Sequence, residues 1–285
     1  MGVPIIHAIV LGLVQGLSEF LPISSSGHLL LVPWLFGWDD FGGPDGDAIK
    51  KTFDVALHLG TFVAVLGYFR RDVITYVREG TLLLVNRKRP TTTDGKLAWF
   101  FVLSTVPAAL VGAFFEDAID ERLGTPTIIA ISLIVFGLLL GWADRMVGKR
   151  QLEQFGARDA LVVGAAQALA LNPGTSRSGI TMTGARALGF DRDSAARISF
   201  VMSLPVIAGA VLFKTYGAIT DGIPSGLYWP MVVGIVTSGI SGLAAVWGTL
   251  RLIRTRSFTP FVVYRVAAGV LVLALIATGV RDGSA

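Results

Sequence analysis

Two hydroxyl-rich stretches carry the side chains of this sequence that could do chemistry. The first runs from Gln15 to His28 between two apolar runs and reads Gln-Gly-Leu-Ser-Glu-Phe-Leu-Pro-Ile-Ser-Ser-Ser-Gly-His. Its candidate nucleophiles and bases are Ser24, Ser25, Ser26, Glu19 and His28. Free backbone N–H groups are expected at Gly27, where the chain re-enters a helix. A hydroxyl beside a base is the arrangement that nucleophilic group transfer requires.

The second stretch, Gln167 to Gly179, brings a guanidinium instead of a carboxylate. The residues around Arg177 are small or hydroxylated, and they are Gly174, Thr175, Ser176, Ser178 and Gly179. A helix N-terminus attracts phosphate, and an arginine side chain holds phosphate oxygens with two parallel donors. The two stretches together predict a site for a phosphate or pyrophosphate group, where catalysis is mostly positioning and charge stabilisation.

The two stretches are copies of one another. When Gln15 is aligned with Gln167, identical residues recur at the same spacing: Ala8 and Ala160, Gly12 and Gly164, Leu17 and Leu169, Ser24 and Ser176, Ser26 and Ser178, Gly27 and Gly179. The chain is therefore a duplication whose two polar stretches differ in charge. The matched glutamines have a structural reading, in which each bonds backbone across the repeat.

Other features of the two stretches also have structural readings. Serine and glycine in a membrane helix often serve close helix packing. His28 can be a hydrogen-bonded structural residue, as can His58 on the first predicted span, outside both stretches. Glu19 with Arg177 can form an ion pair that pins the stretches together. The combination of all these groups in two matched stretches favours function.

Composition identifies an integral membrane protein. The chain is 53% hydrophobic and only 15% charged, against about 25% charged in soluble domains, and its mean hydropathy is +0.66. Without cysteine it has neither disulfides nor thiolate metal sites. The net charge of +4 comes from Lys and Arg in loops beside apolar segments, which is typical of cytoplasmic anchors and not of nucleic-acid binding. The N-terminus lacks a basic leader region, so the first segment is expected to stay in the mature protein.

The order of apolar and polar segments predicts an all-α polytopic membrane protein, a single integral membrane domain built from two repeats. Each repeat is expected to hold one re-entrant helix hairpin and three transmembrane helices, since a span needs about 20 apolar residues. The first repeat is 1–150, with a hairpin at 5–36 and spans near 53–69, 97–115 and 127–143. The second repeat is 151–285, with a hairpin at 160–188 and spans near 198–213, 227–250 and 260–280. An interfacial amphipathic stretch is expected at 73–85.

Charge predicts the orientation of the segments. Positive segments mark the cytoplasmic side, and they are 70–96 (with the basic run 87–90), 144–159, 186–197 and 251–256. The acidic loops at 39–47 and 116–121 then lie outside. Three spans per repeat place the second copy upside down, as in inverted-topology repeats, whose sites form near the midplane from broken helices. The tips of the two hairpins are expected to meet there.

The two stretches resemble one known family, the undecaprenyl-pyrophosphate phosphatases of bacterial envelope synthesis, also called bacitracin-resistance proteins. That family has a Glu/Gln-x-x-x-Glu segment running into Pro-x-Ser-Ser-x-Gly-His, and later a Pro-Gly-x-Ser-Arg-Ser-Gly loop. The matching residues here are Gln15 to Glu19, Pro22 to His28, and Pro173 to Gly179. The resemblance implies removal of the terminal phosphate from undecaprenyl pyrophosphate, in a multi-pass protein of the bacterial inner membrane whose site opens to the external side. It also implies recycling of the carrier lipid for peptidoglycan, bacitracin resistance, and dependence on Mg²⁺ or Ca²⁺.

The resemblance also implies residue roles. Glu19 is the essential carboxylate, as a metal ligand or as the group that activates the nucleophile. Ser25 is the nucleophile or a phosphate-positioning hydroxyl, His28 is a general acid or base, and Arg177 clamps the pyrophosphate. Gln15 stands where the family has a first acidic residue, and its carbonyl oxygen can still ligate a hard cation but cannot act as a base. The remaining phosphate-binding candidates are Ser24, Ser26, Gly27, Gly174, Thr175, Ser176 and Ser178.

Two points stay open from the sequence. Either Ser25 or water attacks the phosphorus. The alternative function is a polyprenyl-phosphate flippase or anion transporter, because inverted repeats with broken helices also build transporter sites. The set of Glu19, Ser25 and His28 favours the phosphatase, since a pure binding site gains little from a base. The expected partners are the lipid substrate and the membrane, with a homodimer as one option.

Overall fold

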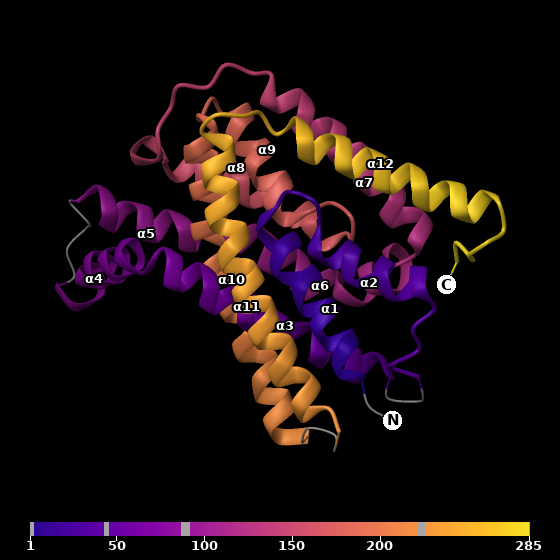
Figure 1. Cartoon of the computed structure of the whole chain (residues 1–285). Helices are drawn as coiled ribbons and strands as arrows, with labels where there is room; N and C mark the ends of the chain where they lie inside the picture. Colours follow the sequence, from indigo (N-terminus) through magenta and orange to yellow (C-terminus); the bar gives the residue numbers. More distant parts are fainter. Residues whose placement is uncertain (1–2, 43–45, 87–91, 222–225, 285) are drawn as a thin grey trace.

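The computed structural model describes residues 3–42, 46–86, 92–221 and 226–284, and this part of the chain is helical throughout, without a β-strand (Figure 1). The α-helices are α1 (Ile5–Phe20), α2 (Ser25–Phe36), α3 (Gly46–Tyr68), α4 (Arg70–Asn86), α5 (Thr93–Leu103), α6 (Val106–Leu123), α7 (Pro126–Asp144), α8 (Ala157–Ala168), α9 (Arg177–Ala187), α10 (Arg192–Asp221), α11 (Tyr228–Ile253) and α12 (Thr259–Ala277). Two 3₁₀ turns, η1 (Leu152–Gln154) and η2 (Leu169–Leu171), flank α8. The predicted all-α class is confirmed.

Several helices are suited to cross a bilayer. Four described segments are long and apolar enough, and they are Thr93–Phe115, α7, α11 and α12. The pair formed by α3 and α4 meets the same test together, with a bend of 84° between its helices. The protein is therefore an integral membrane protein, as its composition predicts. Helix α4 covers the stretch 73–85 expected to be amphipathic.

Two helix pairs, α1–α2 and α8–α9, are each broken by a short loop at a matched position. In the first loop Ser24 has φ 82°, and in the second Ser176 has φ 72°, a conformation rare for residues other than glycine. Each serine caps the next helix: the Ser24 hydroxyl accepts the Gly27 N–H, and the Ser176 hydroxyl accepts the Gly179 N–H. The same backbone device therefore starts α2 and α9, as the sequence duplication leads one to expect. The inverted orientation of the repeats, and their boundary near residue 150, stay predictions.

Helices from the two halves of the sequence pack against each other. Helix α11 lies against α1 and α3, and α7 lies beside α12 (Figure 1). Glycine permits the closest approach, because a Cβ at Gly12 would lie 1.9 Å from the Thr237 hydroxyl and one at Gly16 would lie 1.9 Å from the Ser241 hydroxyl. Small residues at such contacts are typical of membrane helix packing. The first broken pair is thereby held between elements of both halves.

The structure corrects one boundary. The stretch 116–121, expected to be an acidic loop, lies inside α6. The predicted span 97–115 is broken between α5 and α6 near Pro107, which lacks the N–H that a continuous helix would use. Of the predicted charged segments, residues 43–45 of the acidic loop and 87–91 of the basic run lie outside the described residues.

Candidate active site

The two broken loops touch, so the tips of the hairpins meet as predicted. The Ser24 hydroxyl accepts a second hydrogen bond from the Gly174 N–H, at 3.1 Å. In the other direction the Ser178 hydroxyl donates to the Leu21 carbonyl, also at 3.1 Å. Only glycine fits at Gly27 without displacing a neighbour, because a Cβ there would lie 3.2 Å from backbone atoms of Gly174. The loop contact therefore depends on small residues that match across the repeat.

Arg265 of α12 binds both loops from behind. Its side chain is fully buried, and its guanidinium donates to the carbonyls of Pro22 in the first loop and of Gly174 and Thr175 in the second. Two further bonds run to carbonyls of α7, at Ser132 and Leu133. A buried cation satisfied by five carbonyls holds three chain segments in one arrangement.

Glu19 is the centre of the polar groups. Its Oε1 accepts a charge-assisted hydrogen bond from Arg177 Nη2 at 2.7 Å, and its Oε2 accepts from the Ser25 hydroxyl at 2.6 Å. Gln15 Nε2 donates to the same Oε2 at 3.1 Å, and His58 Nε2 lies 3.6 Å from it. The ion pair foreseen between the loops exists, and the same carboxylate also contacts the candidate nucleophile.

These groups line a cavity of about 200 Å³. Its polar lining includes Glu19, Ser24, Ser25, Ser26, His58, Gln167 and Arg177. Its other wall is apolar and comes from α6, η2 and α10, at Ala108, Leu171 and Ile207 among others. One wall can therefore receive an anionic group and the other a hydrocarbon chain.

Several buried polar atoms of the site have no partner in the described part of the chain. They are Gln15 Oε1, both side-chain heteroatoms of Gln167, and Arg177 Nη1. A buried unpaired polar group costs about 1–3 kcal/mol, so such groups are typical of places where a ligand or water completes the bonding. The structural reading of the glutamines, in which both bond backbone across the repeat, is not what the structure shows for Gln167.

His28 lies behind the first loop and does not line the cavity. Its Nδ1 donates to the Ser24 carbonyl at 2.7 Å, which leaves Nε2 as the acceptor for the Tyr264 hydroxyl at 2.7 Å. Both nitrogens are thus engaged, one by the Ser24 backbone and the other by the Tyr264 side chain. Its role as an acid or base stays a prediction.

The remaining phosphate-binding candidates of the second loop build the loop itself. Thr175 is fully buried and accepts from Asn172, while Ser176 and Ser178 make the cap and the loop contact. Their hydroxyls do not line the cavity. The helix starts at Ser25 and Arg177 nevertheless leave their first backbone N–H groups without intrahelical partners.

The fold and the paired loops can be compared with known proteins. Residues 8–271 match the family model described as bacitracin resistance protein BacA. The chain belongs to the BacA family. It is 47% identical to an undecaprenyl-diphosphatase from Pelobacter propionicus over 97% of this chain and 98% of that protein. Similar relatives, with the same name, come from Geobacter sulfurreducens (47%, covering 95% and 98%) and from a Nocardioides species (43%, covering 98% and 98%).

The metal that BacA membership leads one to expect has a limited set of protein ligands. The described residues contain no group of three or more His, Cys, Asp or Glu side chains arranged to hold a metal. Gln15 Oε1 is an unpaired buried oxygen beside Glu19, and such oxygens suit Mg²⁺ or Ca²⁺. Mg²⁺ commonly takes one or two carboxylates and completes its shell with substrate phosphates. The site fits a cation of that kind, brought together with the phosphate.

Sequence reasoning missed three residues of this BacA site. Arg265 is a charged residue within an apolar span, and that alone could have marked it. Tyr264 had no distinguishing signal, because tyrosine is common in membrane helices. His58 was assigned a structural role, yet its Nδ1 bonds the Asp54 carbonyl and its Nε2 faces the cavity.

Proposed function

We propose that the protein hydrolyses undecaprenyl pyrophosphate to undecaprenyl phosphate and inorganic phosphate, in the bacterial inner membrane. The single observation that carries this proposal is the carboxylate of Glu19, which contacts a hydroxyl from one loop and a guanidinium from the other. The membership in the BacA family and the undecaprenyl-diphosphatase name of its relatives support it. The flippase alternative gains no support from those relatives, since all three are named as phosphatases.

The chemistry follows from the hydrogen bonds of Glu19. The Ser25 hydroxyl gives its proton to Glu19 Oε2 as Ser25 Oγ bonds to the terminal phosphorus. The bond from that phosphorus to the bridging oxygen breaks, and the lipid monophosphate leaves. Water then attacks the phosphoserine, Glu19 returns its proton to the leaving serine oxygen, the water proton stays with the phosphate, and inorganic phosphate is released.

Arg177 and the helix starts would stabilise the charge of the transferring group. Arg177 Nη2 is held by Glu19, so the unpaired Nη1 is the donor left for phosphate oxygens. The backbone N–H groups at the starts of α2 and α9 add neutral donors. A divalent cation, Mg²⁺ or Ca²⁺, would be held by Glu19 and Gln15 and would supply further charge stabilisation. The cavity would open to the external side.

The test is phosphate release from undecaprenyl pyrophosphate by detergent-purified protein, with Glu19→Gln and Arg177→Ala beside wild type. Each variant is expected to lose about 10²- to 10⁴-fold in kcat, the usual contribution of a positioned acid–base group or charge. Ser25→Ala separates the two attack routes, because near-normal turnover would exclude the phosphoserine. Absence of release by wild type, with lipid still bound, would reject the phosphatase.

Light scattering of the same detergent-purified sample tests whether the protein is a homodimer.

A further inference from the structure

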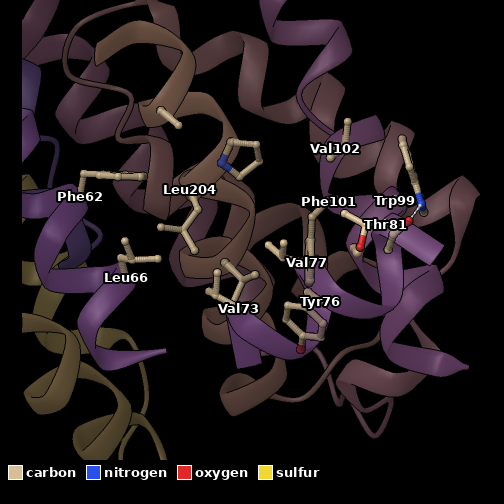
Figure 2. Close-up of a pocket in the computed structure, with 15 residues that line it drawn as sticks. Phe62, Leu66, Val73, Tyr76, Val77, Thr81, Trp99, Phe101, Val102 and Leu204 are labelled. Atoms are coloured by element: carbon tan, nitrogen blue, oxygen red, sulfur yellow. Dashed lines mark hydrogen bonds between the residues drawn. The ribbon is translucent and has the colours of Figure 1, made fainter. Parts of the chain in front are cut away.

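A second cavity lies next to the polar one and is almost purely hydrocarbon. Its volume is about 380 Å³, within the range of roughly 300–1,000 Å³ that small-molecule pockets occupy. Four helices line it: α3, α4, α5 and α10. Figure 2 shows Phe62 and Leu66 on one side of it and Trp99 and Thr81 on the other. The polar cavity suits the charged headgroup of a pyrophosphate lipid, and the apolar cavity suits its hydrocarbon tail.

The two cavities are lined by consecutive turns of the same helices. On α3, His58 lines the polar cavity, and Phe62 and Leu66 line the apolar one. These positions are four residues apart, so they share a helix face that rises about 6 Å from one residue to the next. The apolar cavity therefore begins about one helical turn from the group that contacts Glu19.

Two other segments repeat this relation. On α10, Ile207 belongs to the polar cavity and Leu204, one turn away, to the apolar one. On the broken span, Ala108 of α6 lines the polar cavity and Phe101 of α5 lines the apolar one. Three segments thus run from the apolar wall of the polar cavity into the hydrocarbon cavity.

The far wall of the apolar cavity is built by the bent helix α4. The bend of 84° after α3 turns α4 against α5. Trp99 Nε1 donates to the Gly80 carbonyl at 3.0 Å, and the rings of Tyr76 and Phe101 are 5.7 Å apart. Val77 and Val102 of the lining are largely exposed, so the cavity has an apolar opening at the protein surface through which a long chain can leave.

We propose that this cavity binds the isoprenyl units next to the pyrophosphate of the substrate lipid. The proposal rests on the phosphatase function proposed above, because it is the substrate headgroup in the polar cavity that places the first units of the tail here. We favour this occupant because the apolar wall of the polar cavity leads into the hydrocarbon cavity. A chain attached to a phosphate at Arg177 would follow that wall. A phospholipid acyl chain is the rival occupant.

The first experiment compares two pyrophosphate substrates with tails of different length. Isopentenyl pyrophosphate carries one isoprenyl unit and farnesyl pyrophosphate carries three. Wild type is expected to prefer the longer tail in kcat/KM by roughly tenfold or more, since one methylene in an apolar pocket changes selectivity by about 10- to 200-fold. Filling the cavity from two sides with Ala98→Phe on α5 and Ala208→Phe on α10 should remove most of that preference, because kcat/KM for farnesyl pyrophosphate falls more than kcat/KM for isopentenyl pyrophosphate.

Ala244→Phe is the matched control. Ala244 is exposed on α11, which does not line the cavity, so this variant should keep the wild-type preference. An unchanged farnesyl-to-isopentenyl ratio in both cavity variants would overturn the proposal. So would an equal fall for both substrates, because a blocked tail site must affect the long substrate more.

The second experiment does not depend on turnover. A farnesyl pyrophosphate analogue with a diazirine in its first isoprenyl unit is photolysed on the wild-type protein, and the labelled peptides are identified. Labelling concentrated on α4, α5 and the 201–208 part of α10, and suppressed by Ala208→Phe, is the expected result. Two results would overturn the proposal in favour of bilayer lipid. One is labelling spread over α7 and α12, and the other is labelling that added phospholipid suppresses as strongly as Ala208→Phe does. If wild type hydrolyses neither substrate but is still labelled in the cavity, the phosphatase fails and the tail site stands.

Discussion

Replacing Arg265 with methionine tests whether one buried cation holds the two loops in their catalytic arrangement. Methionine fills similar space but leaves the carbonyls of Pro22, Gly174 and Thr175 without their donor. Buried carbonyls without partners cost about 1–3 kcal/mol each, offset in part because the cation no longer has to be desolvated. We therefore expect Arg265→Met to lower the free energy of unfolding by about 3–5 kcal/mol, since several carbonyls lose their donor at about 1–3 kcal/mol each and the removed desolvation cost of the cation offsets part of that sum.

The assay is unfolding of the detergent-solubilised protein by heat or SDS, together with phosphate release from the fraction that stays folded. Arg265→Lys offers three donors for five carbonyls and should fall between wild type and Arg265→Met. Arg70→Met is the control, because Arg70 is exposed and bonds only the nearby Gly67 carbonyl. Its expected change is within about 0.5 kcal/mol. Wild-type stability and kcat in Arg265→Met would refute the reasoning.

Three further predictions concern the same fold and site. Ser24→Ala deprives two buried N–H groups of their acceptor. Ser176→Ala deprives one N–H group of its acceptor and removes a contact with the Ser178 hydroxyl, which keeps its bond to the Leu21 carbonyl. In thermal unfolding Ser24→Ala should therefore be the more destabilising by about 1–3 kcal/mol, the cost of the second unpaired N–H group; equal losses would contradict the proposed loop contact. Chelation should reduce phosphate release. In a titration with Mg²⁺ after chelation, Gln15→Leu should need a higher Mg²⁺ concentration than wild type to recover its activity; identical titrations would exclude Gln15 as a ligand. Asp144→Asn weakens the bonds to Arg192 and to the Phe258 N–H and should cost about 1–3 kcal/mol of unfolding free energy without changing KM; a changed KM would link that cluster to the site.

The chemistry of the site was readable from residue types. Glu19, Ser25 and Arg177 stand out because charged and hydroxylated groups are costly inside a membrane and are retained where a ligand uses them. The repeat predicts that the two loops meet, and the hydrogen bond between Ser24 and Gly174 confirms that they touch. The helical class followed as directly, since a long apolar segment in a bilayer can satisfy all its backbone groups within itself only as an α-helix.

Other features depended on contacts between distant parts of the chain. His28 is predicted to act as a general acid or base, and that role stays a prediction. Its two nitrogens bond the Ser24 carbonyl and Tyr264, a residue 236 positions away. His58 was expected to be structural, yet the packing of α3 against α1 and α11 turns its Nε2 toward Glu19. The helix in place of the loop at 116–121 is compatible with its residue types, because Glu and Ala are good helix formers.

The sequence by itself determined the solvent in which this protein folds, the duplication and the two reactive loops, because composition and spacing are local properties of the chain. The tertiary structure decided which histidine faces the cavity, that Arg265 binds both loops, and that a hydrocarbon cavity adjoins the polar one. Those outcomes depend on how helices pack across the whole chain, where a rotation of a helix by about 100°, the angle between successive residues, exchanges the groups that it presents to its neighbours.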